Sequence, residues 1–387
     1  MIQIRGNGRS AFDAMLIQSA GNRIQGLAIF NARRSIWIYG SGARNNLIVG
    51  NFIGTNAAGS FGHTVHTLNA SGVQIESGAT DNQIGGTSPA ERNVLSGNAR
   101  HGADLHSEAT NSNQFYNNLI GLNPAGNQRL QNFRHGIDLN AGPSNNIIGG
   151  TGPGQRNIIS GNGEAQSAAF TAGIEISHDT LTDKNQVIGN CIGTDPTCNS
   201  GPSWAINRHY GIRIEDGVNE NIVADNVIGN NPFGGIKVDA AGTDLNQIYN
   251  NRIGISLNNT ALPSDGFGIQ LATSSKSNTI GPNNIITNNA VGVELTGVAT
   301  DKHTITRNSI YNNSRLGIDL GPVTGVTAND SGDSDTGANA ELNMPVLDSA
   351  TTSSVTGTAC AESIVPKPCT IEIFIAERRT SDNGGGN

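Results

Sequence analysis

The chain has 387 residues, of which 51 are glycine, only 4% are aromatic and 14% are charged. So few charged residues argue against long amphipathic helices with Glu and Lys on their exposed faces. The formal net charge of −8 and the absence of a long Lys/Arg run exclude a general nucleic-acid binder. No apolar run approaches the roughly 18 residues that a membrane-spanning helix needs.

Two short phrases recur along most of the chain. The first has the form N-x-I-x-x-N-x-I, as in NNLIVGNFIG at 45–54 and NQVIGNCIG at 185–193, and the copies at 82–98 and 146–162 carry a loop inside it. The second has the form G-[IVA]-x-[ILV] and begins at Gly72, Gly102, Gly136, Gly173, Gly211, Gly235, Gly268, Gly292 and Gly317, after degenerate copies at Ala14 and Ser35.

Both phrases alternate apolar and variable residues, which is the period of a half-buried strand. Strands that return at such intervals predict coils that bury their Ile, Leu and Val side chains only against neighbouring coils. We therefore predict an all-β chain that forms a parallel β-helix of about eleven coils. Extra residues are expected outside the coil, at 55–71, 122–135, 163–172, 194–210 and 255–267.

One asparagine recurs at an equivalent point between two strands, as Asn118, Asn190, Asn226, Asn251 and Asn308. Asparagine tolerates left-handed backbone, and its amide can bond to the asparagines above and below. The sequence therefore predicts a stacked asparagine ladder, with an Asn-lined binding face as the alternative.

These motifs resemble those of the right-handed parallel β-helix repeat proteins of bacterial surfaces and secretions. The resemblance is carried by NxIGG…RNxISGN, by GNxIGT and by the terminal GIDLGPVTGVTANDSGDSDTGAN, and it covers roughly residues 22–348. It implies a right-handed, single-stranded β-helix, an extracellular or cell-surface location in a bacterium and a following β-sandwich-like module. It implies no single activity.

Two nearly identical hexapeptides, RHGADL at 100–105 and RHGIDL at 134–139, fall on the second phrase of successive coils. The residue between the two apolar positions points outward. Successive coils present there Asp104, Asp138, Glu175, Arg213 and Lys237. Carboxylates on strands ~4.8 Å apart repel by ~0.9 kcal/mol even at the dielectric constant of water, so this row needs an offset.

The offset can come from neighbouring Arg or His cations, from a bound Ca²⁺ or from a raised carboxyl pKa, which is what a general acid needs. The candidate catalytic residues are Asp104, Asp138, Glu175, His101, His135, Arg213 and Lys237. Candidate substrate contacts are Arg100, Arg134, Trp204, Arg208, His209 and Tyr210. The structural alternative is a set of solvated charges, because an identical GIDL at Asp319 lacks such neighbours.

The four cysteines form two close pairs, Cys191 with Cys198 and Cys360 with Cys369, which predict two disulfides in an oxidising compartment. In the acidic stretch 329–339, the candidate Ca²⁺ ligands are Asp330, Asp333 and Asp335, and a solvated turn is the alternative. We expect a β-helix at 1–325, an acidic connector at 326–345 and a partial, truncated β module at 346–387.

The expected function is a secreted or cell-surface, adhesin-like scaffold that contacts a polysaccharide or a cell-surface glycan. It requires no cofactor, and Ca²⁺ is the candidate ion. The alternative is a polysaccharide lyase or glycoside hydrolase that acts on an acidic polysaccharide in a groove on the outward face. The first coil has no evident cap, so an oligomer through uncapped coil ends is also considered.

Overall fold

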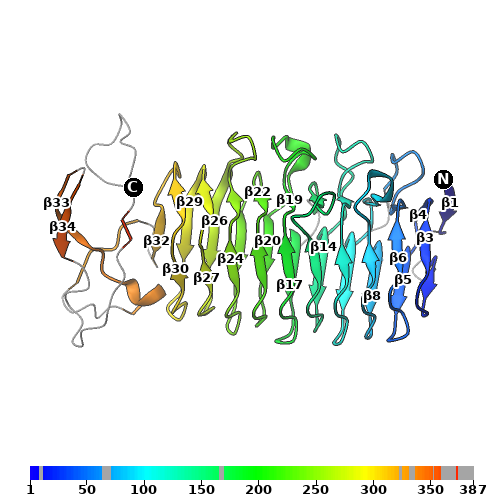
Figure 1. Cartoon of the computed structure of the whole chain (residues 1–387), viewed down its shortest axis with the longest axis horizontal. Coiled ribbons are helices and arrows are strands. Elements are labelled where there is room, and N and C mark those ends of the chain that lie inside the picture. Colours follow the sequence, from blue (N-terminus) through cyan, green and yellow to red (C-terminus); the bar gives the residue numbers. More distant parts are fainter. Residues whose placement is uncertain are drawn as a thin grey trace.

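The computed structural model describes residues 1–7, 12–62, 71–164, 170–321, 325–330, 336–351, 353–358 and 372–373. Its chain winds into a solenoid whose strands stack along the long axis from β1 to β32 (Figure 1). Equivalent strands of successive coils pair in parallel and build three sheets. The predicted all-β parallel β-helix is therefore confirmed.

The three sheets are named here by their first strands. The β1 sheet contains β1 (Ile2–Arg5), β4 (Leu27–Phe30), β7 (Phe52–Ile53), β10 (Val94–Leu95), β13 (Leu119–Ile120), β16 (Ile158–Ile159), β19 (Cys191–Ile192), β22 (Val227–Ile228), β25 (Arg252–Ile253), β28 (Ile285–Thr287) and β31 (Ser309–Tyr311). The β2 sheet contains β2 (Leu16–Ile17), β5 (Ile36–Tyr39), β8 (Val73–Glu76), β11 (Ala103–His106), β14 (Ile137–Asn140), β17 (Ala172–Ser177), β20 (Tyr210–Ile214), β23 (Gly234–Val238), β26 (Ser264–Leu271), β29 (Asn289–Leu295) and β32 (Ile318–Leu320).

The β3 sheet contains β3 (Arg23–Gln25), β6 (Leu47–Val49), β9 (Gln83–Ile84), β12 (Gln114–Phe115), β15 (Ile147–Gly149), β18 (Gln186–Ile188), β21 (Ile222–Ala224), β24 (Gln247–Tyr249), β27 (Thr279–Ile280) and β30 (Thr304–Ile305). Short 3-10 helices lie at η1 (Pro89–Glu91), η2 (Ser203–Ala205) and η3 (Ala338–Glu341), and β33 (Val346–Ala350) and β34 (Val355–Thr358) form an antiparallel hairpin. Among the described residues, no helix reaches the length and hydrophobicity that crossing a bilayer would require.

The two sequence phrases map onto the three sheets. The second phrase forms the β2 sheet, and the two halves of the first phrase form a β3-sheet strand and then a β1-sheet strand, as in β6 and β7. Their alternate apolar residues meet in one continuous core, where Leu105, Leu139 and Ile176 are completely buried. Each coil thus buries its apolar face against the coils beside it.

Among the described residues, three asparagine ladders join neighbouring coils, where the sequence predicted one. The predicted ladder includes Asn118, whose Nδ2 donates to Asn157 Oδ1 at 2.9 Å and to the Ile84 carbonyl at 2.8 Å. A second ladder precedes the β3 sheet and includes Asn113 and Asn146, joined at 3.0 Å. A third precedes the β2 sheet and runs through Asn98, Asn132, Asn162, Asn207 and Asn231.

The left-handed backbone that we assigned to the ladder asparagines lies one residue earlier. Asn117 has φ of 54° and Asn145 has φ of 56°, and these residues precede the ladder members Asn118 and Asn146. The left-handed residue turns the chain between sheets, which points the following amide inward to stack. The buried amides therefore make both inter-coil and backbone hydrogen bonds, which buried polar groups need.

Three of the predicted insertions, at 122–135, 194–210 and 255–267, contribute to an apolar layer on the outer face of the β1 sheet, although Tyr210 and residues 264–267 already belong to β20 and β26. In this layer Leu122 and Leu262, which follow β13 and β25, pack with the Cys191–Cys198 disulfide, and Trp204 packs against the cluster. This disulfide, with Cα atoms 5.6 Å apart, was predicted and is confirmed. Cys360 and Cys369 lie outside the described residues.

The C-terminal end of one ladder is closed by Ala338 and Asn339, which lie in the predicted acidic connector. Asn278 donates its N–H to His303 Nδ1 at 3.2 Å, so His303 takes the place of a ladder asparagine. The N–H of His303 donates to Asn339 Oδ1 at 2.9 Å, and Ala338 belongs to the buried core. Helix η3 therefore adds one more ladder position beyond the last β3-sheet strand.

The ladders make a stability prediction. Replacing Asn118 with Ala removes three buried hydrogen bonds, from the Asn93 amide, to the Ile84 carbonyl and to Asn157 Oδ1, and each contributes about 0.5–1.5 kcal/mol. We expect Asn118→Ala to lower the free energy of unfolding by several kcal/mol, measured by chemical denaturation. Gln128→Ala, an exposed amide in a loop, serves as the control. Equal stability of the two variants would contradict a structural role for the ladder.

Candidate functional site

The outward row of charged residues on the β2 sheet has the predicted order. Asp104 lies opposite Asp138, and Asp138 lies opposite Glu175 on the next coil. Glu175 in turn pairs in register with Arg213, and Arg213 with Lys237. Side chains that are separated by 24 to 38 residues in sequence therefore become direct neighbours.

These carboxylates are not on an open surface, which corrects our expectation. Asp104, Asp138 and Glu175 point away from the core but are only 2%, 4% and 6% exposed. His101 and His135 are buried with them, at 1% and 3% exposed. The imidazoles lie against the acids, so the row forms a second, polar interior outside the sheet.

The first carboxylate of the row, Asp104, is held by Arg100 and Asn140. The Arg100 guanidinium lies 3.4 Å from Asp104, and Asn140 Nδ2 donates to Asp104 Oδ1 at 3.1 Å and to Asp138 Oδ2 at 2.9 Å. Nδ1 of His106 lies 2.6 Å from Asn140 Oδ1. Since the amide oxygen only accepts, His106 carries its proton on Nδ1 and fixes the orientation of the bridging amide.

The two histidines of the hexapeptides stack on each other. Their ring centroids are 5.0 Å apart and their planes differ by 9°. His101 Nε2 lies 3.3 Å from Asp138 Oδ2, and His135 Nε2 lies 2.6 Å from Glu175 Oε2. Because His135 Nδ1 accepts the Ala172 N–H at 3.1 Å, its proton is on Nε2 and is donated to Glu175.

Burial and neighbouring charges push the pKa values of adjacent carboxyl groups apart. Burial raises the pKa of Asp138 to about 8, and it also raises the pKa of Asp104. Burial likewise opposes ionisation of Glu175, but His135 and Arg213 outweigh it and lower the pKa of Glu175 to about 2. At neutral pH the row therefore holds a protonated Asp138 beside an ionised Glu175.

The histidines respond to the same forces in opposite directions. Burial lowers the pKa of His101 well below its usual value, and the nearby His135 and Arg100 add to this shift. Burial also opposes a charge on His135, but the Glu175 carboxylate outweighs it and raises the pKa of His135. His101 is therefore a neutral imidazole at pH 7.

Glu215 belongs to the site and was missed from the sequence. It accepts a close hydrogen-bonded contact from Arg213, which also bonds to Glu175 at 3.1 Å. Burial raises the pKa of Glu215 to about 8, so it pairs with Glu175 as a neutral carboxyl beside an ionised one. The available signal was the period of two, because Glu215, like Asn140 and His106, lies two residues after the outward position.

Some buried polar atoms at the site have no partner among the described residues. Both ring nitrogens of His101 and Oδ1 of Asp138 make no hydrogen bond there. The Nε atoms of Arg100 and Arg213 likewise make no hydrogen bond to the described residues. Because an unpaired buried polar group costs free energy, such a concentration is typical of a place where another molecule or a proton transfer is accommodated.

An aromatic cluster borders the row where the cations begin. Phe170 and Phe233 are 51% and 44% exposed, and their ring centroids are 6.1 Å apart. His209 packs edge-on against Phe233 at 4.7 Å, and Tyr210 stacks near Phe267 at 6.0 Å. The Lys237 ammonium lies 5.7 Å from the Tyr210 ring, and the Arg213 guanidinium lies 5.8 Å from the Phe170 ring.

The structure does not bring every candidate residue to this place. Trp204 packs on the apolar layer over the β1 sheet, away from the acidic row. Arg208 is exposed, and its charge acts on His209, whereas the charge of Arg134 acts on His101 and His135. Asp333 and Asp335 lie outside the described residues, and among those described no cluster of three or more His, Cys, Asp or Glu side chains suits a metal ion.

The β-helix region of known proteins provides the comparison that decides the handedness. A family model described as a right handed beta helix region matches residues 200–332. The chain folds as a right-handed parallel β-helix. No curated protein sequence matches it.

Several solved structures are similar to this β-helix protein. The A-module of the mannuronan C-5 epimerase AlgE4 of Azotobacter vinelandii has 14% identity and a TM-score of 0.45, over 84% of this chain and 88% of that one. The periplasmic alginate epimerase AlgG has 12% identity and a TM-score of 0.37, over 81% and 76%. The DFA-IIIase of Arthrobacter chlorophenolicus has 12% and 0.27, over 81% and 74%.

The split carboxyl pKa values make a pH-dependent stability prediction. Asp138 has a pKa of about 8 in the folded β-helix and an ordinary value of 3.8, so unfolding releases its proton between these values. Its burial therefore weakens the fold progressively as pH rises from about 4 to 8. Asp138→Asn removes this loss, and we expect its melting temperature, relative to the parent, to rise over that interval.

Glu175→Gln is the matched control with the opposite sign. The pKa of Glu175 is lowered from 4.5 to about 2, so its contribution is present above the first value and is lost as pH falls to the second. We expect Glu175→Gln to be most destabilised near neutral pH and least at about pH 2. Melting curves whose offsets do not change with pH in either variant would contradict the assigned protonation states.

Proposed function

We propose that this β-helix is a secreted or cell-surface protein that binds an acidic polysaccharide across the outer face of the β2 sheet. The observation that carries the proposal is the exposed pair Phe170 and Phe233 in contact with His209, Tyr210 and Arg213. Aromatic faces stack on the apolar faces of sugar rings, and adjacent cations bind their carboxylates. The disulfide Cys191–Cys198 fits an oxidising compartment.

The charge of the site supports an anionic ligand although the whole chain carries −8. Asp138 and Glu215 have pKa values of about 8 and are mostly protonated at neutral pH. The ionised carboxylates Glu175 and Asp239 are bound by Arg213 and Lys237. Arg100 is bound to Asp104, and the further cations Arg134 and Arg208 around the row then leave a local positive excess, which attracts a polyanion.

Substitution of the two exposed rings tests this binding. We expect the double change Phe170→Ala with Phe233→Ala to weaken binding of uronate polymers about tenfold, since each aromatic contact contributes about 0.5–1.5 kcal/mol. Isothermal calorimetry with a panel of uronate and neutral polymers at two salt concentrations measures the effect. Leu257→Ala, an exposed apolar residue on another loop, is the control. Unchanged affinity in the double variant would remove the proposed surface.

A second candidate function is cleavage of the same polymer, by a polysaccharide lyase or glycoside hydrolase reaction. It is favoured by the neutral Asp138 on the strand beside ionised Glu175, because such a pair supplies a proton donor and a base or nucleophile. The charged ends of Arg213 and Lys237 are bound by the protein's own Glu175 and Asp239, so we assign neither cation to proton abstraction. Because the acids are buried, turnover requires side chains above them to move, whereas binding does not.

Product analysis separates cleavage from binding alone. If the polymer is cleaved, Asp138→Asn and Glu175→Gln should each lower the rate at least a hundredfold while Lys276→Met, on a distant bend, leaves it unchanged. Unsaturated ends, followed by ultraviolet absorbance, indicate a lyase, and saturated reducing ends indicate a hydrolase. Binding of a uronate polymer without either product would exclude cleavage and support the binding function.

A further inference from the structure

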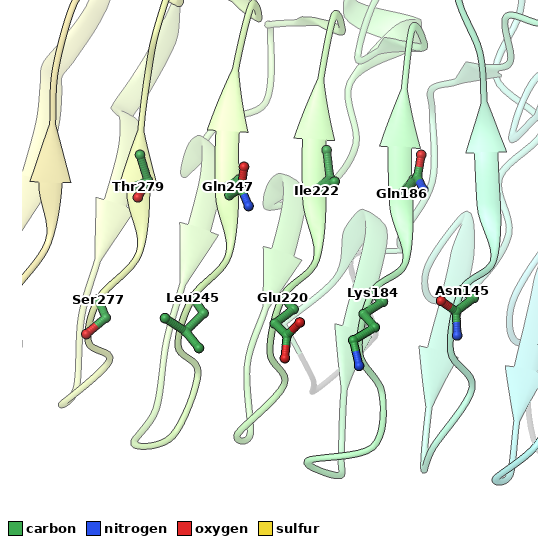
Figure 2. A pocket seen from close by; sticks show the side chains of 9 residues that line it. All are labelled: Asn145, Lys184, Gln186, Glu220, Ile222, Leu245, Gln247, Ser277 and Thr279. Carbon is green, nitrogen blue, oxygen red and sulfur yellow. The ribbon is translucent and has the colours of Figure 1, made fainter.

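A second surface feature lies on a different side of the solenoid, on the outer face of the β3 sheet. It is a pocket of about 500 Å³ that crosses five successive coils. Figure 2 shows its lining side chains in two rows that follow the stacking direction, namely Asn145, Lys184, Gln186, Glu220, Ile222, Leu245, Gln247, Ser277 and Thr279. None of these residues takes part in the charged row of the β2 sheet.

The first row of the groove stands on the strands. Gln186 lies opposite Ile222, Ile222 opposite Gln247, and Gln247 opposite Thr279, in the parallel register of β18, β21, β24 and β27. Adjacent strands are about 4.8 Å apart, so the row offers one side chain per coil at that spacing. This repeat is close to the length of one pyranose unit in an extended chain.

The second row stands on the left-handed bends. Lys184, Glu220 and Leu245 have φ of 55°, 56° and 60°, and each immediately precedes an asparagine of the buried ladder. The bend turns the ladder amide inward, so the residue before it faces outward (Figure 2). Both rows of the groove are therefore tied to the rigid part of the coil.

The groove offers hydrogen-bonding groups that the protein itself does not use. The side chains of Gln186, Glu220, Gln247 and Thr279 make no hydrogen bond or ion pair to any described residue. The ladder amides directly beneath them are fully paired. Half-buried Ile222 and exposed Leu245 add apolar surface between these polar groups.

The charge and the backbone of the groove limit the classes of ligand that it can bind. Lys184 and Glu220 are the charged residues of the lining, and they cancel, which disfavours a polyanion such as a uronate polymer or a nucleic acid. The strand N–H and C=O groups are paired between coils, so an extended peptide finds no free backbone edge on this face. What remains is recognition by amide, carboxylate and hydroxyl side chains beside aliphatic surface, which suits a hydroxyl-rich neutral chain.

We propose that the groove on the β3 sheet binds a neutral linear glycan that runs along the solenoid axis, with one sugar unit over each coil. The amides of Gln186 and Gln247 and the hydroxyl of Thr279 bond to sugar hydroxyls, and Ile222 and Leu245 contact the apolar faces of the rings. This site is independent of the acidic-polysaccharide surface proposed for the β2 sheet. The β-helix then presents two glycan sites of different chemistry on different faces.

Calorimetry and NMR titration with short β-linked gluco-, manno- and xylo-oligosaccharides test the proposal on the whole chain. At least one of these series should bind, and the double change Gln186→Ala with Gln247→Ala should weaken that binding tenfold or more, since two hydrogen bonds are lost. Leu245→Glu should weaken it as well by adding charge. All three positions are solvent-facing, so circular dichroism and melting temperature should match the parent.

Gln114→Ala is the matched control, because Gln114 stands on the same sheet but outside the groove. It should bind like the parent, and so should Phe233→Ala, which belongs to the other surface. The proposal is overturned if no neutral oligosaccharide binds, or if Phe233→Ala abolishes binding while the double glutamine variant retains it. Displacement of the oligosaccharides by extended peptides with equal affinity would identify a peptide groove and would overturn it too.

Discussion

The whole molecule depends on the pairing of each coil with the coils beside it. No coil buries its apolar side chains alone, and the buried asparagine amides bond to the coils on both sides, as Asn118 does to Asn157 and to the Ile84 carbonyl. A buried amide without a hydrogen-bond partner costs about 1–3 kcal/mol, and a shift in register would leave several ladder amides unpaired. The register between coils is therefore fixed. That fixed register carries every outward residue into a column, and both proposed glycan surfaces are columns of this kind.

A fixed register also forces unfavourable neighbours together, and the β2 sheet shows how the molecule accommodates them. Asp104, Asp138 and Glu175 stand on adjacent strands and cannot all ionise at low cost. Burial holds Asp138 neutral, with a pKa of about 8, while His135 and Arg213 hold Glu175 ionised with a pKa of about 2. The difference in pKa between Asp138 and Glu175 is what a general acid and its partner need. It thus follows from placing three acids on adjacent strands.

Sequence alone predicts the stack and the order of its outward residues, because a period of two decides which side of a strand each residue takes. It does not predict what covers that side. Asp138 was expected on an open face, but the imidazoles of the hexapeptides fold over the row and bury it. Glu215 was missed because one outward position per strand was followed and the next was not. The ladder through Asn132 and Asn162 was missed since loops of unequal length hide its spacing.

The two faces also show why one repeat can serve two chemistries. On the β2 sheet, long insertions bring residues such as Phe170 and His209 beside the strands, so burial and shifted pKa values arise there. On the β3 sheet, short bends keep Lys184 and Glu220 exposed and Gln186 free of internal partners. Because the ladder amide follows each bend directly, the bend residue can vary without disturbing the coil. The outer columns of the β3 sheet are therefore the part of this fold where ligand preference can change at the least cost in stability.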